Sequence, residues 1–486
     1  MTRATLLGLC MAVLIGPGAQ WVNAQDSRLD TNPMPLNQSL PSLGSPASQA
    51  LSPGEEARIG QEMMREVRGA LDWVEDPAIN AYIRDLGARI AAATSMPAAH
   101  YQFFVIDDPR INAFAMPGGY IGIHSGLITA SRTESELGAV VAHELSHVTQ
   151  RHIAERIAAA QGTNLRTAAM VLAGLLISSQ NPQAGMAAAT SGMASGIDSQ
   201  LAYSREHERE ADRQGMRILA NASLNPQGMP DFFNVLNDDS RYRRTPPPFL
   251  STHPLTEARI ADARAIANQL QPKTPFESPD YVYVRARAQV LGADNLNDTL
   301  AAFQARMASD PSAGERYGLA LALIQTGSPE RGAAHLNALR KANGENGLLH
   351  LGLAEASLAQ GQVDTAIEQL EQGLSLFPDQ TALRYQQVEA YLQANANAKA
   401  VALTRTLTHE QPDAAEIWAL HAKTSSQAGD QTESAIAMAH YYAVQGDLEA
   451  GLSQLRQVDS NTASASQWAR AEALRARWER RLTTAS

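Results

Sequence analysis

Two histidines and a glutamate in one short apolar run have the residue types and spacing that metal chemistry requires. The run Val140–Val148 reads Val-Val-Ala-His-Glu-Leu-Ser-His-Val and contains an H-E-x-x-H motif at His143, Glu144 and His147. Residues four apart on a helix share one face, so both imidazoles can reach the same ion. Zinc accepts such nitrogens at about 2.0 to 2.1 Å. The spacing therefore predicts that His143 and His147 bind one zinc ion.

Glu144 directly follows the first of these histidines and would project beside the metal. A carboxylate in that place can take a proton from water that the ion activates and return the proton to the leaving amine. The expected reaction is hydrolysis of a peptide bond without a covalent acyl-enzyme. A chance match on an amphipathic helix is the alternative. We interpret Glu144 as a catalytic base.

A catalytic zinc needs a third protein ligand, which the sequence must supply. A histidine ligand immediately downstream would require glycine at position 150 and histidine at position 153, where the chain has Gln150 and Ile153. His152 lies five residues past His147, so on a continuous helix it turns away from the shared face. It is therefore predicted to be a polar surface residue.

A better candidate for the third ligand lies in Ser204–Asp212, which predicts a second helix dense in carboxylates. Glu208 and Asp212 are four residues apart, so one could bind zinc while the other accepts the free N–H of a ligating imidazole. A solvated, charged helix face is the alternative that spacing alone leaves open.

These residues resemble the M48 family of metallopeptidases, which pairs H-E-x-x-H with a downstream E-x-x-x-D that Ser-Arg often introduces. In this chain Ser204 and Arg205 precede Glu208 and Asp212. The resemblance implies that Glu208 is the third zinc ligand. It also implies that Asp212 orients a ligating histidine.

Two further segments match the same family. Asn112 and Ala113 begin the sequence Asn-Ala-Phe-Ala, which resembles an edge strand that binds the substrate backbone by strand addition. His253 stands in a Thr-His-Pro sequence that the family tends to carry. It could act in catalysis by donating to the oxyanion of the tetrahedral intermediate, or it could occupy the open zinc position and hold the enzyme off. A turn residue before Pro254 is the alternative, and the sequence does not choose.

Local patterns predict the elements that must position these residues. Tyr101–Ile106 predicts a strand, and Ala113–Ile123, which Pro-Gly-Gly interrupts, predicts a hairpin. A helix is predicted over Thr133–Ala159, with Thr133 and Glu136 spaced as a capping box. With the resemblance, these elements imply an α+β zincin-like (gluzincin) metalloprotease domain over residues 52–270, mostly helical with a small sheet. Its first helix begins at Ser52-Pro53.

The C-terminal part of the chain repeats with a step of 34 residues. Gly327, Gly361, Asn395 and Gly429 lie on one such grid. Further positions keep the same step: Ala366 and Ala400; Pro378 and Pro412; Ala320, Ala354, Val388 and Ala422. The pattern is typical of tetratricopeptide helix pairs and predicts an all-α solenoid over residues 280–482. Such an array usually binds peptides or proteins, and a purely structural extension is the alternative.

The aromatic residues of the array fall at spacings that favour the core over a ligand surface: Tyr391, Trp418, Tyr441 and Tyr442. No binding residue is predicted there.

The first 24 residues read as an export signal. Arg3 precedes an apolar run, Ala4–Ile15, and Val22-Asn23-Ala24 provides a small-x-small cleavage site. A membrane anchor is the alternative, but the run is shorter than the roughly 20 residues that span a bilayer. Cys10, the sole cysteine, would leave with this segment, which suits an oxidising compartment such as a bacterial periplasm. Residues 25–51 are rich in Ser, Pro, Asn and Gln and predict a flexible leader.

Charge and composition exclude some partners. The formal net charge is −11 and there is no run of Lys and Arg, so nucleic acid is not expected as a partner. The apolar stretch Thr167–Ile177 is too short to cross a bilayer, so the mature chain is predicted to have no transmembrane anchor. Ser178–Gln200 is expected to be a connecting loop or, alternatively, a mobile cover over the active site.

A protease domain joined to a tetratricopeptide array after a signal peptide resembles periplasmic proteases of Gram-negative bacteria. The resemblance implies a zinc endopeptidase and chaperone that degrades stalled or misfolded outer-membrane proteins. The array would recruit an outer-membrane β-barrel assembly complex or its unfolded client. Two alternatives remain: a docking scaffold with a largely latent zinc site, and a generic periplasmic endopeptidase.

Overall fold

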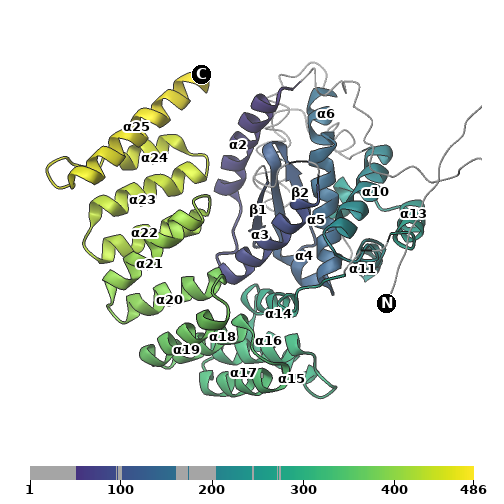
Figure 1. Cartoon of the computed structure of the whole chain (residues 1–486). Helices are drawn as coiled ribbons and strands as arrows, with labels where there is room; N and C mark the ends of the chain where they lie inside the picture. Colours follow the sequence, from purple (N-terminus) through teal and green to yellow (C-terminus); the bar gives the residue numbers. More distant parts are fainter. Residues whose placement is uncertain are drawn as a thin grey trace, which may run out of the picture. The chain divides into compact units, whose positions relative to one another are not determined.

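The computed structural model describes residues 51–94, 96, 101–159, 173–174, 204–242, 246–270, 272 and 275–485. Over these residues the protein is mostly helical, with one small sheet beside helix α5 (Glu134–Thr149) (Figure 1). No described helix is long and apolar enough to span a bilayer. The predicted signal peptide and leader up to residue 50 lie outside the described residues. So do the stretches 167–177, apart from residues 173–174, and 178–200.

The sheet has three strands in the order β1-β3-β2: β1 (Gln102–Ile106), β2 (Ala113–Met116) and β3 (Tyr120–His124). β1 pairs with β3 in parallel, while β2 and β3 form the predicted hairpin with Ala113 opposite Ile123. A short 3-10 turn, Pro117–Gly119, joins them, and Gly118 has a φ of 80° that favours glycine. This topology leaves β2 at the edge of the sheet, and β3 leads into α4 (Ser125–Ala130).

The helices α2 (Pro53–Ala70), α3 (Pro77–Ala92) and α5 each begin at a side chain that accepts a backbone N–H, which is Ser52, Asp76 and Thr133 respectively. The start of α2 at Ser52-Pro53 agrees with the sequence prediction. The capping box predicted for α5 is only half formed, because Glu136 accepts the backbone N–H of Arg132 instead. Each cap satisfies a donor that the first turn leaves without an intrahelical partner.

The single helix predicted over Thr133–Ala159 is wrong, because the structure has two helices there, α5 and α6 (His152–Ala159). Arg151, between them, has a φ of 59°, a left-handed conformation that a continuous α-helix does not contain. The Arg151 guanidinium donates to the carbonyl oxygen of Leu51 at 2.7 Å. Leu51 itself is 1% exposed and belongs to the core, although the sequence assigned it to the leader.

Among the described residues, the protease region continues with the helices α10 (Arg205–Asn221), α11 (Gly228–Tyr242), α12 (Pro248–Thr252) and α13 (Glu257–Ala267). α10 begins at Ser204, whose hydroxyl accepts the backbone N–H of His207 at 3.1 Å. The helix packs closely on α5 at Gly215, where an added Cβ would lie 3.2 Å from the backbone nitrogen of His143. This close crossing holds the carboxylates of α10 against the histidines of α5.

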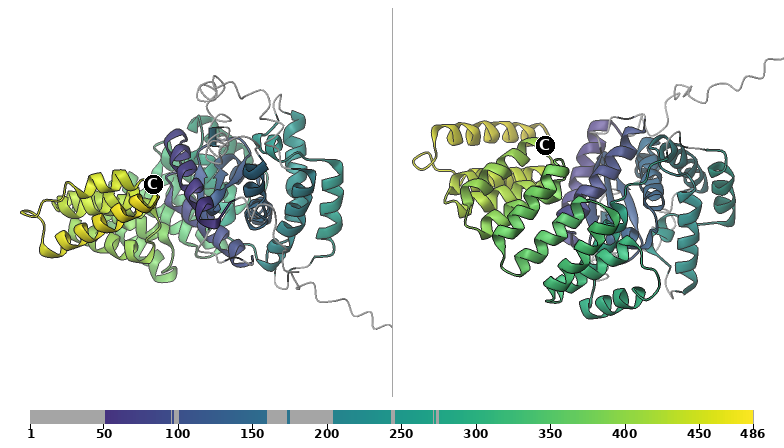
Figure 2. Two further views of the ribbon diagram at one scale, coloured as in Figure 1. Left: turned by 90° about the horizontal axis from the view of Figure 1, so that it is seen from above. Right: turned by 60° about the horizontal axis from the view of Figure 1, so that its bottom comes forward.

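The remaining helices stack in chain order as a helical array (Figure 2). They are α14 (Tyr281–Leu291), α15 (Leu296–Arg306), α16 (Ala313–Gln325), α17 (Pro329–Asn343), α18 (Gly347–Ala359), α19 (Val363–Leu376), α20 (Thr381–Gln393), α21 (Asn397–Glu410), α22 (Ala415–Gln427), α23 (Gln431–Val444), α24 (Leu448–Leu455) and α25 (Ala465–Ala485). The predicted fold class, a small-sheet α+β protease region followed by an all-α array, is confirmed.

The 34-residue grid marks one structural position in each repeat. Gly327, Gly361, Asn395 and Gly429 all have positive φ, between 54° and 86°, and each follows the first helix of a pair. A left-handed residue ends a helix and turns the chain back, which glycine and asparagine tolerate best. A second set of positions with the same step is buried where the helices pack, and Ala320, for example, is 0% exposed. The other members of this set are Ala354, Val388 and Ala422.

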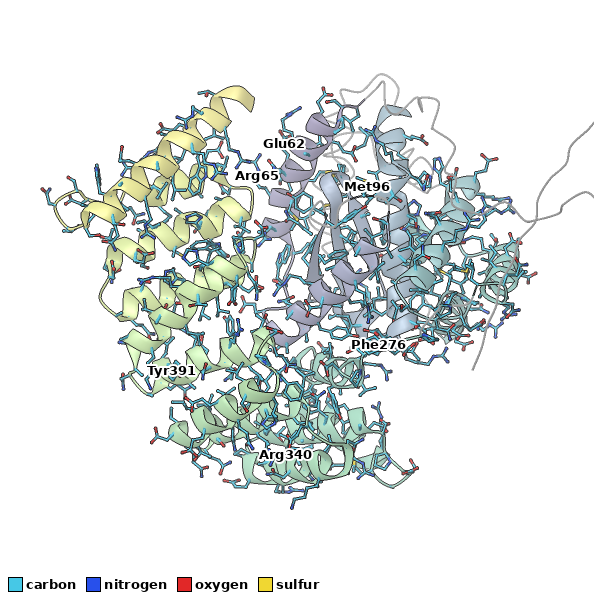
Figure 3. The ribbon with its side chains drawn as sticks, viewed as in Figure 1. Glu62, Arg65, Met96, Phe276, Arg340 and Tyr391 are labelled. Atoms are coloured by element: carbon cyan, nitrogen blue, oxygen red, sulfur yellow. The ribbon has the colours of Figure 1, made fainter. Side chains whose placement is uncertain are left out.

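One hydrophobic core passes from the protease region into the first repeats, since a single cluster of buried residues extends from Leu51 to Ala390. Ion pairs also connect the protease region with the helical array. Arg287 of α14 lies 2.7 Å from Asp76 and 2.5 Å from Glu355 of α18. On α2, which carries Glu62 and Arg65 (Figure 3), Arg65 lies 3.8 Å from Glu449 of α24.

Candidate metal centre

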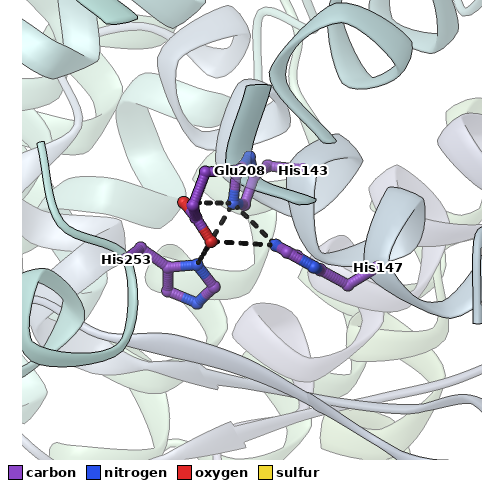
Figure 4. Close-up of side chains that lie close together, drawn as sticks. All are labelled: His143, His147, Glu208 and His253. Atoms are coloured by element: carbon purple, nitrogen blue, oxygen red, sulfur yellow. Dashed lines mark hydrogen bonds and ion pairs between the residues drawn. The ribbon is translucent and has the colours of Figure 1, made fainter. Parts of the chain in front are cut away.

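His143 and His147 project from one face of α5, as the four-residue spacing predicts. Their Nε2 atoms lie 3.1 Å apart, and both side chains are almost completely buried (Figure 4). Burial and the neighbouring His143 lower the pKa of His147 well below its usual range. The His147 imidazole is therefore neutral, which is the form that binds a metal ion.

Glu208 reaches the same point from α10. Its Oε1 lies 3.5 Å from His147 Nε2 and its Oε2 lies 3.6 Å from His143 Nε2. Burial alone would raise the pKa of Glu208, but His253, His143 and Arg259 outweigh burial and lower it. The carboxylate is ionised and faces two imidazole nitrogens.

His253 completes the cluster from the residue that follows α12. Its Nδ1 lies 3.0 Å from Glu208 Oε1 and 3.3 Å from His143 Nε2 (Figure 4). One ligand atom from each of the four residues, His143, His147, Glu208 and His253, falls within 4.8 Å of the other three. The structure thus brings together four side chains that are up to 110 residues apart in sequence.

This donor set fits zinc. Three imidazole nitrogens and one carboxylate oxygen are ligands that zinc commonly takes, and all four side chains are buried. The lone pairs of buried imidazole and carboxylate groups that face one another are best satisfied by a shared cation. His143, His147 and Glu208 would hold the metal, and His253 supplies a possible fourth donor.

Glu144 lies beside the cluster and is 0% exposed. Burial raises the pKa of Glu144 to about 8. Among the described residues, no donor makes a well-aligned hydrogen bond to either oxygen, although His253 Nε2 lies 3.4 Å from Oε1. The backbone N–H of Ala115 in β2 is close enough to favour the ionised form. The carboxyl group is thus poised to hold or release a proton next to the edge strand.

Asp212 lies one helical turn beyond Glu208 and contacts His143 from the side opposite to the cluster. Its Oδ1 is 3.0 Å from His143 Nδ1. Burial alone would raise the pKa of Asp212, but hydrogen bonds with His143 and Arg259 outweigh burial and lower it. An ionised Asp212 fixes the proton of His143 on Nδ1 and leaves Nε2 with a free lone pair.

Arg259 on α13 is a site residue that sequence reasoning missed. It is 4% exposed, lies 2.7 Å from Glu208 Oε2, and makes two hydrogen bonds to Asp212 at 2.7 and 2.8 Å. The bidentate pair keeps both carboxylates ionised and oriented. No local motif marks Arg259, because its partners are 47 and 51 residues away in sequence.

His152 is the second missed residue, and its predicted surface position is wrong. The side chain is 2% exposed, and its Nδ1 lies 3.0 Å from Nδ1 of His147. The prediction assumed a continuous helix, whereas the left-handed Arg151 breaks the helix and turns His152 back towards the site. A break at the end of α5 left no clear signal in the sequence.

Ala113 begins edge strand β2 and Asn112 directly precedes it, but their side chains do not join the cluster. Asn112 is buried, and its Nδ2 lies 3.4 Å from Nε2 of His124. Ala113 is fully buried in the core. A role of these two residues in binding substrate through their backbone stays a prediction.

Comparisons with known proteins agree with this geometry. Residues 77–267 match the profile of Peptidase family M48, and residues 357–424 match that of the Tetratricopeptide repeat. The chain is 33% identical over 425 residues to the Beta-barrel assembly-enhancing protease of Escherichia coli, covering 87% of both proteins. The chain belongs to peptidase family M48. It is a zinc metalloendopeptidase with tetratricopeptide repeats.

Two further proteins are similar to this chain over different lengths. The Putative beta-barrel assembly-enhancing protease of Vibrio cholerae is 32% identical over 447 residues, which cover 91% of this chain and 90% of that protein. The Mitochondrial metalloendopeptidase OMA1 of Schizosaccharomyces pombe is 28% identical over 212 residues, 42% of this chain and 59% of that protein. The bacterial relatives thus share both the metal centre region and the repeats.

Proposed function

We propose that this protein is a periplasmic endopeptidase that hydrolyses peptide bonds in misfolded or stalled outer-membrane proteins. The convergence of His143, His147 and Glu208 beside the buried Glu144 carries this proposal. Similarity to a Beta-barrel assembly-enhancing protease over 87% of both chains supports the substrate class. The export signal read from residues 1–24 supports the compartment.

The chemistry divides between the ion and the side chains. Bound zinc supplies Lewis acidity, which polarises the peptide carbonyl and lowers the pKa of water. Glu144 accepts the proton of the attacking water and passes it to the leaving amine. Asp212 and Arg259 hold His143 and Glu208 in the orientation and charge state that metal binding requires.

The edge strand would select unfolded chains. β2 has β3 on one side, and no described strand pairs with its other side, so an extended peptide can add there by backbone hydrogen bonds. Ala113 would provide the first of these backbone groups, and Asn112, whose carbonyl oxygen accepts the N–H of His124, would hold the start of β2 against β3. A folded protein does not offer a free extended segment, so this mode favours stalled or misassembled clients.

The repeat array would bring clients to the metal centre. Its helix pairs form the kind of surface that binds proteins, and a shared scaffold raises the local concentration of a bound client. We propose that the array docks on an outer-membrane β-barrel assembly complex or on its unfolded client. Holding such a client without cleaving it would give the protein a chaperone activity.

A second candidate, a scaffold with a largely latent zinc site, is favoured by the position of His253. Its Nδ1 lies among the ligand atoms, 3.0 Å from Glu208 and 3.3 Å from His143. A histidine there would fill the fourth position that a catalytic zinc keeps open for water or substrate. We propose that His253 is a latch that closes the site until a client displaces it.

Replacement of Glu144 by Gln separates the candidates. Glu144→Gln keeps the size of the side chain but removes the proton acceptor, so cleavage of an unfolded protein such as casein should fall by about 10² to 10⁴. Zinc content, measured by metal analysis, should be unchanged. Glu66→Gln, on the exposed face of α2, is the control and should cleave normally.

The same variant is then tested in cells that lack the wild-type protein. The proposed function requires that Glu144→Gln no longer clears stalled outer-membrane proteins. Full function of this variant in cells would support the scaffold instead. A third outcome would indicate a generic periplasmic endopeptidase. In that case the wild-type protein cleaves in vitro, but cells that lack it keep normal levels of outer-membrane proteins.

A further inference from the structure

His152 lies directly behind His147, on the side away from the metal cluster. The Nδ1 atoms of the two rings are 3.0 Å apart, and both side chains are buried. The break in the helix at Arg151 creates this contact, because it lets His152, the first residue of α6, turn back onto the last turn of α5. The ring of His152 faces His147 with its centroid 5.1 Å away.

The contact fixes which nitrogen carries each proton. His147 directs Nε2 into the cluster, where a metal ligand needs a free lone pair, so its proton must sit on Nδ1. That N–H then donates to Nδ1 of His152, which must be the acceptor. The proton of His152 consequently sits on Nε2, which lies 3.6 Å from Oε2 of Glu210. This pair of tautomers is consistent with the metal position and with both contacts of His152.

Glu210 and His207 hold the His152 ring in the orientation in which Nδ1 can accept the proton of His147. The ring of His207 stacks on it with centroids 4.3 Å apart and planes 16° apart. Nε2 of His207 lies 3.2 Å from Oε2 of Glu155, which anchors the stacked ring in turn. Glu210 and His207 both come from the first turns of α10, the helix that also supplies Glu208. α10 therefore supplies the proposed ligand Glu208 and also holds His152, which lies behind the proposed ligand His147.

The two histidine ligands thus have different supports. Nδ1 of His143 lies 3.0 Å from a carboxylate oxygen of Asp212, which an arginine keeps ionised. His147 donates to an imidazole. We propose that His152 is a positioning residue that fixes the tautomer and ring orientation of His147 and thereby strengthens metal binding. This inference rests on the proposed zinc function of the cluster but concerns affinity for the metal rather than cleavage.

The test uses the full mature chain, stripped of metal, and measures the zinc dissociation constant by competition with a chromogenic chelator. His152→Ala removes the acceptor and should weaken zinc binding by about 10- to 100-fold. His152→Asn should retain most of the affinity, because its Oδ1 occupies the place of Nδ1 and accepts the same N–H. His152→Gln places its amide where Nε2 stood, so it should lose affinity as alanine does.

This order of affinities distinguishes an oriented hydrogen bond from simple packing. Thermal melting of each metal-free variant reports folding, and His152→Asn keeps the test valid if His152→Ala does not fold. The inference is overturned if His152→Ala binds zinc like the wild type, or if asparagine loses as much affinity as glutamine. Absence of stoichiometric zinc in the wild-type protein would instead contradict the proposed function itself.

Discussion

His253 makes two kinds of contact that bear on whether the enzyme rests in a closed state. Nδ1 lies among the ligand atoms, while Nε2 lies 3.4 Å from Oε1 of the proposed base Glu144. A latch would block both the open metal position and the proton acceptor. An oxyanion donor would instead have to face the substrate carbonyl with the same ring.

Replacement of His253 by Ala distinguishes the two roles. If His253 is a latch, the variant should cleave an unfolded protein faster, on the order of tenfold for a closed state that the ring favours by about 1.4 kcal/mol. It should keep one zinc per chain through the other three ligands. A loss of cleavage would assign His253 to the oxyanion. Thr252→Ala, which removes only a hydrogen bond to the carbonyl oxygen of Phe249, is the matched control.

At the scale of single residues, the sequence predicts those site residues that lie at a fixed helical spacing from one another. His143, Glu144 and His147 follow from a helix period, and Glu208 with Asp212 from the same period plus a family pattern. Arg259 and His152 could not be predicted in the same way. The first depends on a tertiary contact with no local pattern, and the second on a helix break at Arg151 that no glycine or proline marks.

The crossing of α5 and α10 sets the geometry of the metal centre as a whole. At Gly215 the helices approach so closely that an added Cβ would lie 3.2 Å from the nitrogen of His143 and 3.3 Å from the carbonyl of Ala142. Glu208 and Asp212 lie on the same face of α10 as Gly215, since they precede it by seven and three residues. Any displacement at Gly215 therefore moves both carboxylates away from the histidines.

We expect Gly215→Ala to force α10 outward by a few tenths of an ångström. Overpacking of this kind costs about 1 to 3 kcal/mol of unfolding free energy, and zinc affinity should fall several-fold because the ligands separate. Urea unfolding and chelator competition measure the two effects. Gly69→Ala is the control, since no atom lies within 4 Å of its added Cβ. Wild-type affinity and stability for Gly215→Ala would show that this contact does not set the site.

The elements themselves were largely predictable because their signals are local. The hairpin, the start of α2 and the 34-residue grid all rest on glycine, proline and capping residues at fixed positions, and the structure confirms each. The periodicity of the sequence does not predict which faces of the helices and strands pack against one another. The parallel pairing of β1 with β3 and the close approach at Gly215 depend on contacts between distant segments.

At the scale of the whole chain, the sequence suggested a protease domain and a repeat array with a boundary near residues 270–280. The structure joins them more closely, because one cluster of buried residues extends from Leu51 to Ala390. Hydrogen bonds cross the same junction: the hydroxyl of Tyr281 donates to the carbonyl oxygens of Ile128 and Ser131. Such a junction predicts that the protease region and the first repeats unfold together.

Arg287 is the residue through which this coupling can be tested. It is 6% exposed and lies 2.7 Å from Asp76, the cap of α3, and 2.5 Å from Glu355 of α18. Replacement by alanine leaves two carboxylates facing each other without a cation. Breaking a buried pair in this way typically costs about 3 to 5 kcal/mol.

Arg287→Ala should therefore accelerate hydrogen exchange in α3 and in α18 by similar factors, because both helices lose the same partner within one core. Mass spectrometry of peptides from the two helices measures each independently, and urea unfolding should show one transition at lower denaturant. Arg331→Ala, at an exposed position of α17, should change neither within about 0.5 kcal/mol. Faster exchange confined to α18 would mean that the repeats open while the protease region stays folded, and clients could then bind the array without any effect on the metal centre.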